Sequence, residues 1–349
     1  MIDVKVEISN LFKIFGPNPN GLMGLVKNGI SKHDLLDQHG HVLGLRDINI
    51  NVPARRIQVI MGLSGSGKST LIRHINRLIE PTSGEIIIDG EDVLEMPQLQ
   101  LREFRRRKVS MVFQNFGLLP HRTVAQNVAY GLTIQGIKRV EAIEHSQQWT
   151  ERVGLAGFEN HYPAQLSGGM RQRVGLARAL ATDAEILLMD EAFSALDPLI
   201  RTDMQDVLLR LQHELHKTII FITHDLDEAL RIGDRIAILR DGAVMQIGDS
   251  QEIIMNPADD YIADFTKDIN RGRVIEVRSI MDSAVDASGP ELRSTMPIED
   301  ALQILIDATN NSGVVVDDNG KIVGKVDLER AVSVIARPDK ELQKGLRYK

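Results

Sequence analysis

The segment that most constrains the fold is RRIQVIMGLSGSGKSTLIRH, residues 55–74. Its apolar start predicts a buried strand, its glycines predict a turn, and the apolar positions that follow predict a helix. Residues 62–69 fit the pattern G-x-x-x-x-G-K-[S/T] in the strand-to-helix context that this motif requires. An ordinary turn between a strand and a helix has no need of the lysine and serine at these positions. We therefore expect a loop that binds phosphate groups.

The chemistry of this loop follows from its residue types. Glycine permits a backbone that wraps closely around phosphate oxygens with its N–H groups turned inward, and the start of the following helix favours negative charge. Lys68 is expected to reach the β- and γ-phosphates, and Ser69 to bind Mg²⁺. The residues predicted to hold the nucleotide here are Gly62, Ser64, Gly65, Ser66, Gly67, Lys68, Ser69 and Thr70.

Further buried strands follow along the chain. ILLMD, residues 186–190, and KTIIFITHD, residues 217–225, are apolar runs flanked by segments with helical periodicity. Buried strands that alternate with helices predict a parallel sheet covered on both faces, so the predicted fold class is α/β. The length of 349 residues suggests about two domains. The pattern changes after Pro257, and residues 274–336 predict a smaller α+β unit.

Two carboxylates follow the strand at 186–190. Asp190 ends the apolar run, where it is expected to hold Mg²⁺, and Glu191 is placed to accept a proton from the attacking water as a general base. An apolar run that ends in Asp-Glu is by itself more often structural. The phosphate loop earlier in the chain favours the functional interpretation.

A second glycine-containing motif, LSGGMRQR, covers residues 166–173. Ser167, Gly168 and Gly169 come just before the apolar-periodic helix VGLARALA, so they form a second helix start able to bind phosphate. Ser167 acting simply as a helix N-cap fits the local sequence equally well.

Taken in order, these motifs resemble those of the ABC ATPases, and the resemblance covers about residues 4–255. It implies a P-loop NTPase fold of ABC type with a helical subdomain that carries the signature motif LSGGM. It also implies ATP and Mg²⁺ as cofactors. Two copies are expected to pack head to tail, with each ATP between the phosphate loop of one subunit and the signature of the other.

The resemblance assigns roles to four further residues. Gln114 matches the residue that senses Mg²⁺ and contacts the membrane subunit, and His224 matches the switch histidine that contacts the γ-phosphate. Asp197, in SALD, matches the loop that crosses the dimer interface. Phe15 matches the aromatic residue that stacks on adenine, with Phe12 as the alternative. The predicted catalytic residues are Lys68, Gln114, Glu191 and His224, and the predicted Mg²⁺ ligands are Ser69, Gln114 and Asp190.

An insertion at residues 17–43 distinguishes this chain from a minimal ABC ATPase. It resembles the insertion of importers for glycine betaine, proline betaine and choline, with the choline importers the most similar. Those ATPases carry C-terminal CBS modules in pairs, and residues 274–336 resemble one such module. The predicted domains are an ATPase domain at 1–270 and a CBS-like regulatory domain at 271–349.

The expected function is therefore to power uptake of choline or glycine betaine through membrane permease subunits and an extracytoplasmic solute-binding protein. An importer of another solute, such as an amino acid, is the alternative. A soluble ABC protein of DNA repair or translation is a more distant one, because such proteins usually carry two ATPase domains or a long coiled coil.

Composition excludes some other classes of protein. The absence of cysteine excludes disulfides and thiolate metal sites, and the histidines show no spacing typical of zinc. The net charge of -7 argues against nucleic acid as a partner, so the basic run at 101–108 is interpreted as a solvated helix face and Trp149 as a packing residue. We see no signal peptide and no membrane-spanning apolar run. The expected location is peripheral, on the cytoplasmic face of the inner membrane.

Overall fold

The computed structural model describes residues 3–283 and 288–336, and the chain divides into two compact units, Met1–Ile247 and Gly248–Lys349. The sequence predicted this boundary later, at 270/271. The difference has a local cause in the side chain of Gln251. That side chain donates to the Val274 carbonyl (2.8 Å) and accepts from the Glu276 N–H (3.0 Å), so the segment after Gly248 packs with the C-terminal unit.

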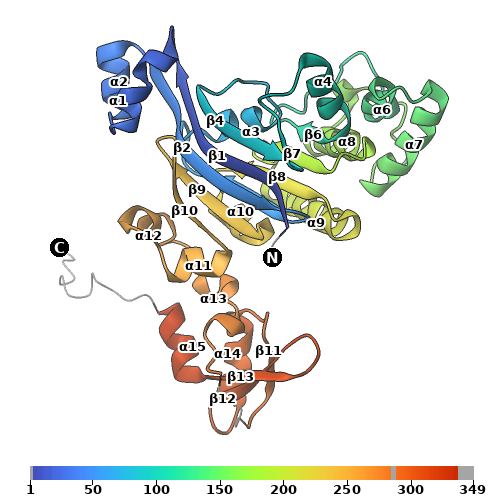
Figure 1. Cartoon of the computed structure of the whole chain (residues 1–349). Helices are drawn as coiled ribbons and strands as arrows, with labels where there is room; N and C mark the ends of the chain where they lie inside the picture. Colours follow the sequence, from blue (N-terminus) through green and yellow to red (C-terminus); the bar gives the residue numbers. More distant parts are fainter. Residues whose placement is uncertain (1–2, 284–287, 337–349) are drawn as a thin grey trace, which may run out of the picture. The chain divides into compact units, whose positions relative to one another are not determined.

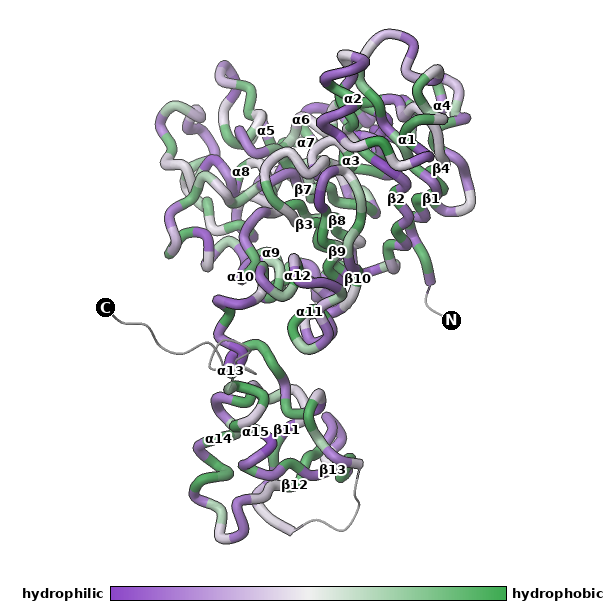
Figure 2. The backbone as a smooth tube through the Cα atoms, turned by 90° about the vertical axis from the view of Figure 1, so that its left-hand side faces the viewer, coloured by the Kyte–Doolittle hydropathy of each residue, from purple (hydrophilic) through white to green (hydrophobic). Residues whose placement is uncertain are grey.

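A six-stranded sheet forms the centre of the first unit, with the strand order β10-β9-β3-β8-β7-β6. Its strands are β3 (Ile57–Met61), β6 (Val109–Val112), β7 (Ile186–Asp190), β8 (Thr218–Thr223), β9 (Arg235–Arg240) and β10 (Ala243–Gly248). The pairs β9–β3, β3–β8, β8–β7 and β7–β6 are parallel, as predicted. The central strands β3, β7 and β8 are buried along their whole length and are mostly hydrophobic (Figure 2), as expected for a parallel sheet covered on both faces.

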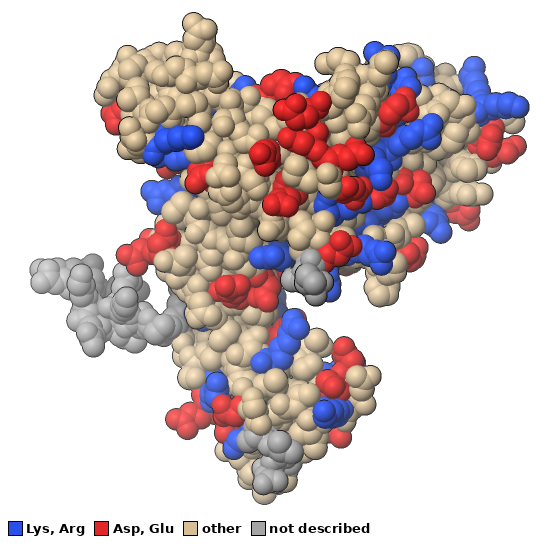
Figure 3. All heavy atoms as spheres, in the orientation of Figure 1, with Lys and Arg blue, Asp and Glu red and all other residues tan. Residues whose placement is uncertain are grey.

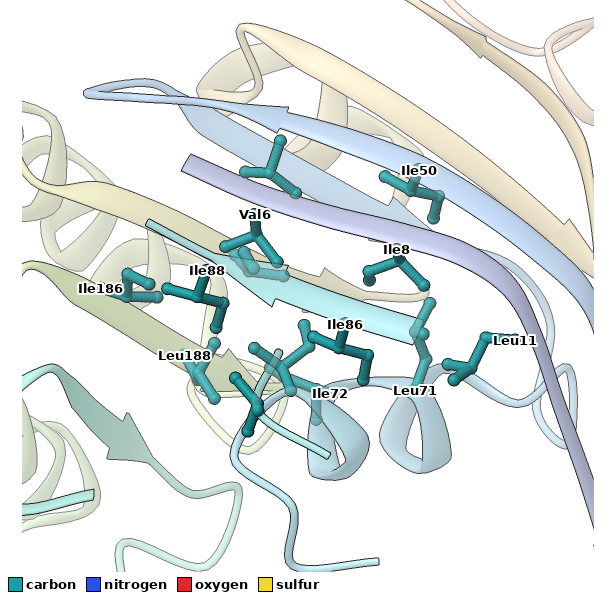
Figure 4. Close-up of a cluster of buried hydrophobic side chains, with 14 of the residues drawn as sticks. Val6, Ile8, Leu11, Ile50, Leu71, Ile72, Ile86, Ile88, Ile186 and Leu188 are labelled. Carbon is teal, nitrogen blue, oxygen red and sulfur yellow. The ribbon is translucent and has the colours of Figure 1, made fainter. Parts of the chain in front are cut away.

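A second, antiparallel sheet has the order β2-β1-β4-β5. Its strands are β1 (Val4–Phe15), β2 (Val42–Pro53), β4 (Ser83–Ile88) and β5 (Glu91–Asp92). Side chains from β1 and β4 meet those of β7 and of helix α3 (Lys68–Ile75) in one buried cluster (Figure 4). This core fixes α3, and with it the loop that precedes α3.

Helices cover the first unit and form a subdomain of their own. The subdomain consists of α5 (Val124–Val128), α6 (Tyr130–Ile134), α7 (Arg139–Arg152) and α8 (Gly168–Ala181), and Trp149 packs against its core, as predicted. The remaining helices are α4 (Gln98–Arg107), α9 (Pro198–Leu215) and α10 (Leu226–Ile232). The basic face of α4 is only partly solvated, because Arg105 donates to the carbonyls of Asn76 (2.8 Å) and Arg77 (2.5 Å).

The insertion lies between β1 and β2, as predicted, and forms η1 (Pro19–Leu22), α1 (Met23–Lys27) and α2 (Lys32–His39). In Figure 1 these helices lie at one end of the β1–β2 ribbon. Val26 and Leu35 are buried against Phe12, Ile14 and Leu43 of the two strands. Each such side chain contributes roughly 1.5–3 kcal/mol when buried, so the insertion is part of the folded unit.

The C-terminal unit is α+β, as predicted. It begins with α11 (Ser250–Met255), α12 (Asp260–Phe265), α13 (Arg271–Val274) and η3 (Val277–Ser279), and continues with β11 (Glu291–Arg293), α14 (Ile298–Asp307), β12 (Ser312–Val316), β13 (Ile322–Asp327) and α15 (Leu328–Ile335). Strands β12 and β13 form an antiparallel hairpin, and β11 adds to β12 in parallel. Among the described residues, no helix is long and apolar enough to cross a membrane.

Candidate nucleotide site

The phosphate loop, residues 62–69, joins β3 to α3 and adopts a conformation that requires glycine. Gly62, Gly65 and Gly67 have φ values of 149°, 77° and 102°, in the left-handed region. A Cβ on Gly62 would lie 2.2 Å from the Leu239 carbonyl oxygen, and one on Gly67 would lie 2.6 Å from that of Gly44. Both the backbone conformation and the close packing therefore exclude larger residues at Gly62 and Gly67.

Lys68 is held inside the loop by the loop's own backbone. Its ammonium group donates to the carbonyls of Gly62 (2.9 Å) and Leu63 (3.1 Å), and the side chain is buried. Burial lowers the pKa of Lys68, and the nearby carboxylates of Glu191 and Asp190 oppose that shift. Ser66 Oγ is also buried and has no hydrogen-bond partner among the described residues. The loop therefore holds a partly desolvated cation and an unsatisfied hydroxyl, which fits an anionic ligand.

Asp190 ends β7 and lies beside the first turn of α3. The Ser69 hydroxyl donates to its carboxylate (2.7 Å), and Arg73 contacts the other oxygen at 3.4 Å. These oxygen donors suit Mg²⁺, which prefers one or two carboxylates together with phosphate oxygens and water. Among the described residues, no group of three or more His, Cys, Asp or Glu side chains is placed to hold a metal ion by itself. The donor set thus fits an ion that shares its coordination with a bound nucleotide.

Glu191 brings together three of the predicted catalytic residues. Its carboxylate accepts from the Gln114 amide (3.2 Å) and lies 3.5 Å from His224 Nδ1 and 3.8 Å from Lys68 Nζ. The backbone at Glu191 has φ 45°, which is unusual for a residue with a side chain, and its N–H donates to the Ile222 carbonyl (3.1 Å). A hydrogen bond to the neighbouring parallel strand thus holds the Glu191 backbone in this conformation.

Ser167, Gly168 and Gly169 lie at the start of α8 in the helical subdomain. The Ser167 hydroxyl accepts from the Met170 N–H (3.3 Å), so Ser167 caps α8. Asp197 likewise caps α9 by accepting from the Ile200 N–H (3.1 Å). A Cβ on Gly169 would lie 2.5 Å from the Ile200 side chain. The structure therefore packs the signature against the first turn of α9, the helix that Asp197 caps.

The two phenylalanines near the N-terminus lie in different environments. Phe12 is buried in the core beneath the insertion, whereas Phe15 is 38% exposed, with the Lys13 ammonium 4.9 Å from its ring centre. A Cβ on Gly44 would lie 2.7 Å from the Phe15 ring, and Gly44 itself packs against Gly67. Phe15 is therefore the aromatic side chain available beside the phosphate loop.

Sequence reasoning missed two contacts of the site. Lys32 of the insertion donates to the Gly65 carbonyl (2.8 Å), and Arg73 reaches Asp190. A lysine at the start of a helix carries no motif, so only the three-dimensional contact identifies it. Arg73 follows Ser69 by four residues, about one turn along the same helix, and this spacing could have identified it as a second contact of Asp190.

A glycine-rich phosphate loop, a carboxylate at the end of a buried strand and a general base next to a histidine together define a P-loop ATPase. Residues 45–194 match the family model described as "ABC transporter". The glycine betaine/proline betaine transport ATP-binding protein of Escherichia coli is 48% identical over 93% of this chain and 81% of its own length. The chain belongs to the ABC transporter ATP-binding proteins, and it groups with those of the quaternary-amine importers.

Other relatives and solved structures agree. The glycine betaine transport ATP-binding protein of Bacillus subtilis is 48% identical over 93% of this chain and 76% of its own length. A dimeric bacterial ABC transporter cassette has a TM-score of 0.60 and 32% identity over 70% of this chain and 98% of its own. A post-hydrolysis state of the same cassette, bound to ADP and Pi, gives the same values. The chain thus has the ABC ATPase fold.

Proposed function

We propose that this chain powers the import of a small quaternary ammonium solute such as glycine betaine or choline. The observation that carries the catalytic part is the convergence of Gln114, His224 and Lys68 on the Glu191 carboxylate. The solute class is supported by the relatives, which span the C-terminal unit as well as the ATPase unit. A methionine import ATP-binding protein of Staphylococcus haemolyticus is 44% identical but matches only 65% of this chain. The quaternary-amine group is therefore the better match.

The proposed chemistry uses the contacts described above. Lys68 and the N–H groups of the loop bind the β- and γ-phosphates, and Phe15 stacks on adenine. Ser69, Asp190 and Gln114 hold Mg²⁺, which when bound neutralises phosphate charge. Glu191 accepts a proton from the attacking water, and His224 contacts the γ-phosphate. Glu191 and His224 are within reach of each other, so the histidine also orients the carboxylate.

The signature is proposed to act in a second copy of the chain. Ser167, Gly168 and Gly169 offer N–H groups and a hydroxyl at a helix start, and Gly169 packs against Ile200 of α9, the helix that Asp197 caps. The likeness to a dimeric ABC cassette supports this arrangement. Each ATP would then lie between the loop of one copy and Ser167 of the other.

A groove beside Gln114 is proposed to receive the membrane permease. It has a volume of about 720 Å³, and the exposed apolar side chains of Leu78, Phe113 and Ile134 line it together with Arg102 and Arg178. An apolar floor with a basic rim suits a short segment of a membrane subunit. Docking there would place the chain on the cytoplasmic face of the membrane, with the solute-binding protein reached through the permease.

The C-terminal unit is proposed to be a CBS-like regulatory domain within residues 271–349. Its sheet and the helices α14 and α15 give it the α+β composition expected for one module. Truncation after Gly248 should leave basal ATP hydrolysis intact and change how transport responds to ionic strength. Truncation after Asn270 is a harsher test, because it strips Gln251 of its contacts with Val274 and Glu276. An unchanged response to ionic strength after both truncations would leave the unit without a regulatory role.

The proposed function is tested with the chain reconstituted in vesicles with its permease and binding protein. ATP hydrolysis should rise when glycine betaine or choline is added, and should not rise with methionine. Stimulation by methionine alone would favour the amino acid importer. A chain that stays in the soluble fraction and binds nucleic acid would favour a soluble ABC protein of DNA repair or translation. The face shown in Figure 3 argues against nucleic acid as a partner, because acidic and basic side chains are interspersed on it.

A further inference from the structure

We propose that Lys32 is a positioning residue for nucleotide binding, by which the insertion braces the phosphate loop. This inference rests on the proposed function of the loop. Lys32 is the first residue of α2, and its ammonium group donates to the Gly65 carbonyl at 2.8 Å. Gly65 is the central glycine of the loop, and a Cβ there would meet no atom within 4 Å, so neighbouring side chains do not confine it.

The insertion is itself firmly fixed, so Lys32 transmits a rigid constraint. Leu35 is fully buried in the core shared with β1 and β2. The Ser31 hydroxyl caps α2 by accepting from the Asp34 N–H (3.0 Å). The guanidinium of Arg46, in β2, donates to the Ile30 carbonyl just before the helix. The residues just before and just after Lys32 are thus both attached to the sheet, through Ile30 and Leu35.

The same strand also supports the next two residues of the loop, Ser66 indirectly through Gly242 and Gly67 directly. The Arg46 N–H donates to the Gly242 carbonyl (2.7 Å), and the Gly242 N–H donates to the Ser66 carbonyl (3.1 Å). The Gly44 carbonyl packs directly against Gly67. Residues 65, 66 and 67 therefore each meet a support that originates in the insertion or in β2.

The effect on the loop follows from peptide geometry. A trans peptide group is planar, and its carbonyl and N–H point in opposite directions. Holding the Gly65 carbonyl therefore helps to fix the direction of the Ser66 N–H, which here donates to the Leu63 carbonyl (3.2 Å), and holding the Ser66 carbonyl fixes that of the Gly67 N–H. Glycine loses more conformational freedom than other residues when it is ordered. A loop that is ordered in advance loses less of that freedom when it binds phosphate, so its affinity is higher.

The brace makes a distinctive prediction about which nucleotides are affected. Lys32 contacts the loop backbone, which surrounds the phosphates that ATP and ADP share. Lys32→Met should therefore weaken ATP and ADP binding by the same factor, roughly three- to tenfold for one exposed, charge-assisted hydrogen bond. Hydrolysis at saturating ATP should stay within about twofold of the parent, because the geometry around Glu191 does not involve Lys32.

The experiment is an equilibrium titration of the full-length chain with ATP and, separately, with ADP, combined with steady-state hydrolysis. Lys32→Arg keeps a donor and should retain most of the affinity. Lys27→Met removes the same charge from the same insertion, where the lysine lies over the Phe12 ring, and should leave the affinity unchanged. Thermal unfolding of each variant confirms that the insertion stays folded.

Three outcomes would overturn the brace: an unchanged affinity in Lys32→Met, an equal loss in Lys27→Met, or a loss for ATP alone, which would indicate direct contact with the γ-phosphate. Failure of the parent chain to bind either nucleotide would instead refute the proposed function. The parent titration separates these two failures.

Discussion

Two helices in this chain, α3 and α8, each follow a glycine-containing motif, but the side chains around their N-termini differ. The phosphate loop before α3 has its glycines in left-handed conformations, a buried lysine and the carboxylates of Asp190 and Glu191 alongside. The signature before α8 has an ordinary N-cap, with Ser167 bonded to Met170, and Arg171 donates back to the Leu166 carbonyl (2.8 Å). In the function proposed above, the first helix start supplies the groups for hydrolysis and the second supplies groups that only bind. Each chain would then carry two halves of a site, and a second copy would join them.

The largest effect is expected when Glu191, the proposed general base, is replaced. Glu191→Gln keeps the size of the side chain and a hydrogen bond but accepts no proton, so hydrolysis should fall about 1,000-fold. ATP binding should persist, and an ATP-bound dimer should accumulate on size-exclusion chromatography. Glu185→Gln, at a surface ion pair, is the matched control and should hydrolyse ATP normally. Turnover of Glu191→Gln within twofold of the parent would place the base elsewhere.

Replacing Lys68, the buried lysine of the phosphate loop, should have the second-largest effect. Lys68→Ala deletes a charge-assisted contact to phosphate, so ATP affinity should fall about 100-fold in an equilibrium titration. Lys108→Ala removes a lysine that pairs with Asp89 and Glu185 at the surface, and should bind ATP as the parent does. An unchanged affinity in Lys68→Ala would contradict the assignment of the loop.

A mixed dimer tests directly whether the two halves belong to different copies. One subunit carries Lys68→Ala and the other carries Ser167→Arg. In a head-to-tail dimer both changes fall on one nucleotide site, so the other site should still trap labelled nucleotide, at about half the parent level. Differently tagged subunits allow the mixed species to be isolated. Loss of both sites would show that Ser167 acts within its own chain.

The smallest expected effect concerns His41, which belongs to the insertion that contacts the phosphate loop. His41 closes the insertion, with Nε2 2.6 Å from the Pro17 carbonyl oxygen and Nδ1 2.6 Å from that of His39. Both ring nitrogens face acceptors, so the protonated ring is favoured. The Pro17 carbonyl, followed by that of His39, raises the pKa of His41 above its ordinary 6.5.

A raised pKa in the folded state means that the stabilisation is fully present below pH 6.5 and is lost as the pH rises through the higher folded value. His41→Gln should therefore lower the thermal midpoint slightly, by less than about 2 °C, at acidic pH, and the difference from the parent should vanish at alkaline pH. A difference that stays the same across this range would show that the ring is not protonated in the folded chain.

Much of the site could be read from the sequence because its parts are local motifs. Neighbouring residues in the chain identify the loop glycines and Lys68. They also identify Asp190 and Glu191 at the end of β7, and the strands around these motifs are apolar runs. The sequence assigned Gln114, His224 and Lys68 to one nucleotide site, and the structure adds that all three lie close to the Glu191 carboxylate.

The parts that sequence reasoning missed depend on contacts between distant residues. Lys32 and Gly65 are 33 residues apart, and Arg105 reaches the Arg77 carbonyl 28 residues away. No local pattern marks such pairs. The division of the chain after Ile247 also depends on such contacts, because the partners of Gln251 lie 23 and 25 residues further along.

The order of strands in the central sheet has a consequence for how the chain reaches its native state. β3 lies between β8 and β9, its neighbours in the sheet, although more than 150 residues separate β3 from β8 in the chain. During synthesis the phosphate loop therefore emerges long before the strands that hold its edges, and loop closure over such a distance is slow. Nucleotide that binds only the completed sheet would then trap the late-forming native state, so ATP should raise the yield of refolding as well as drive transport.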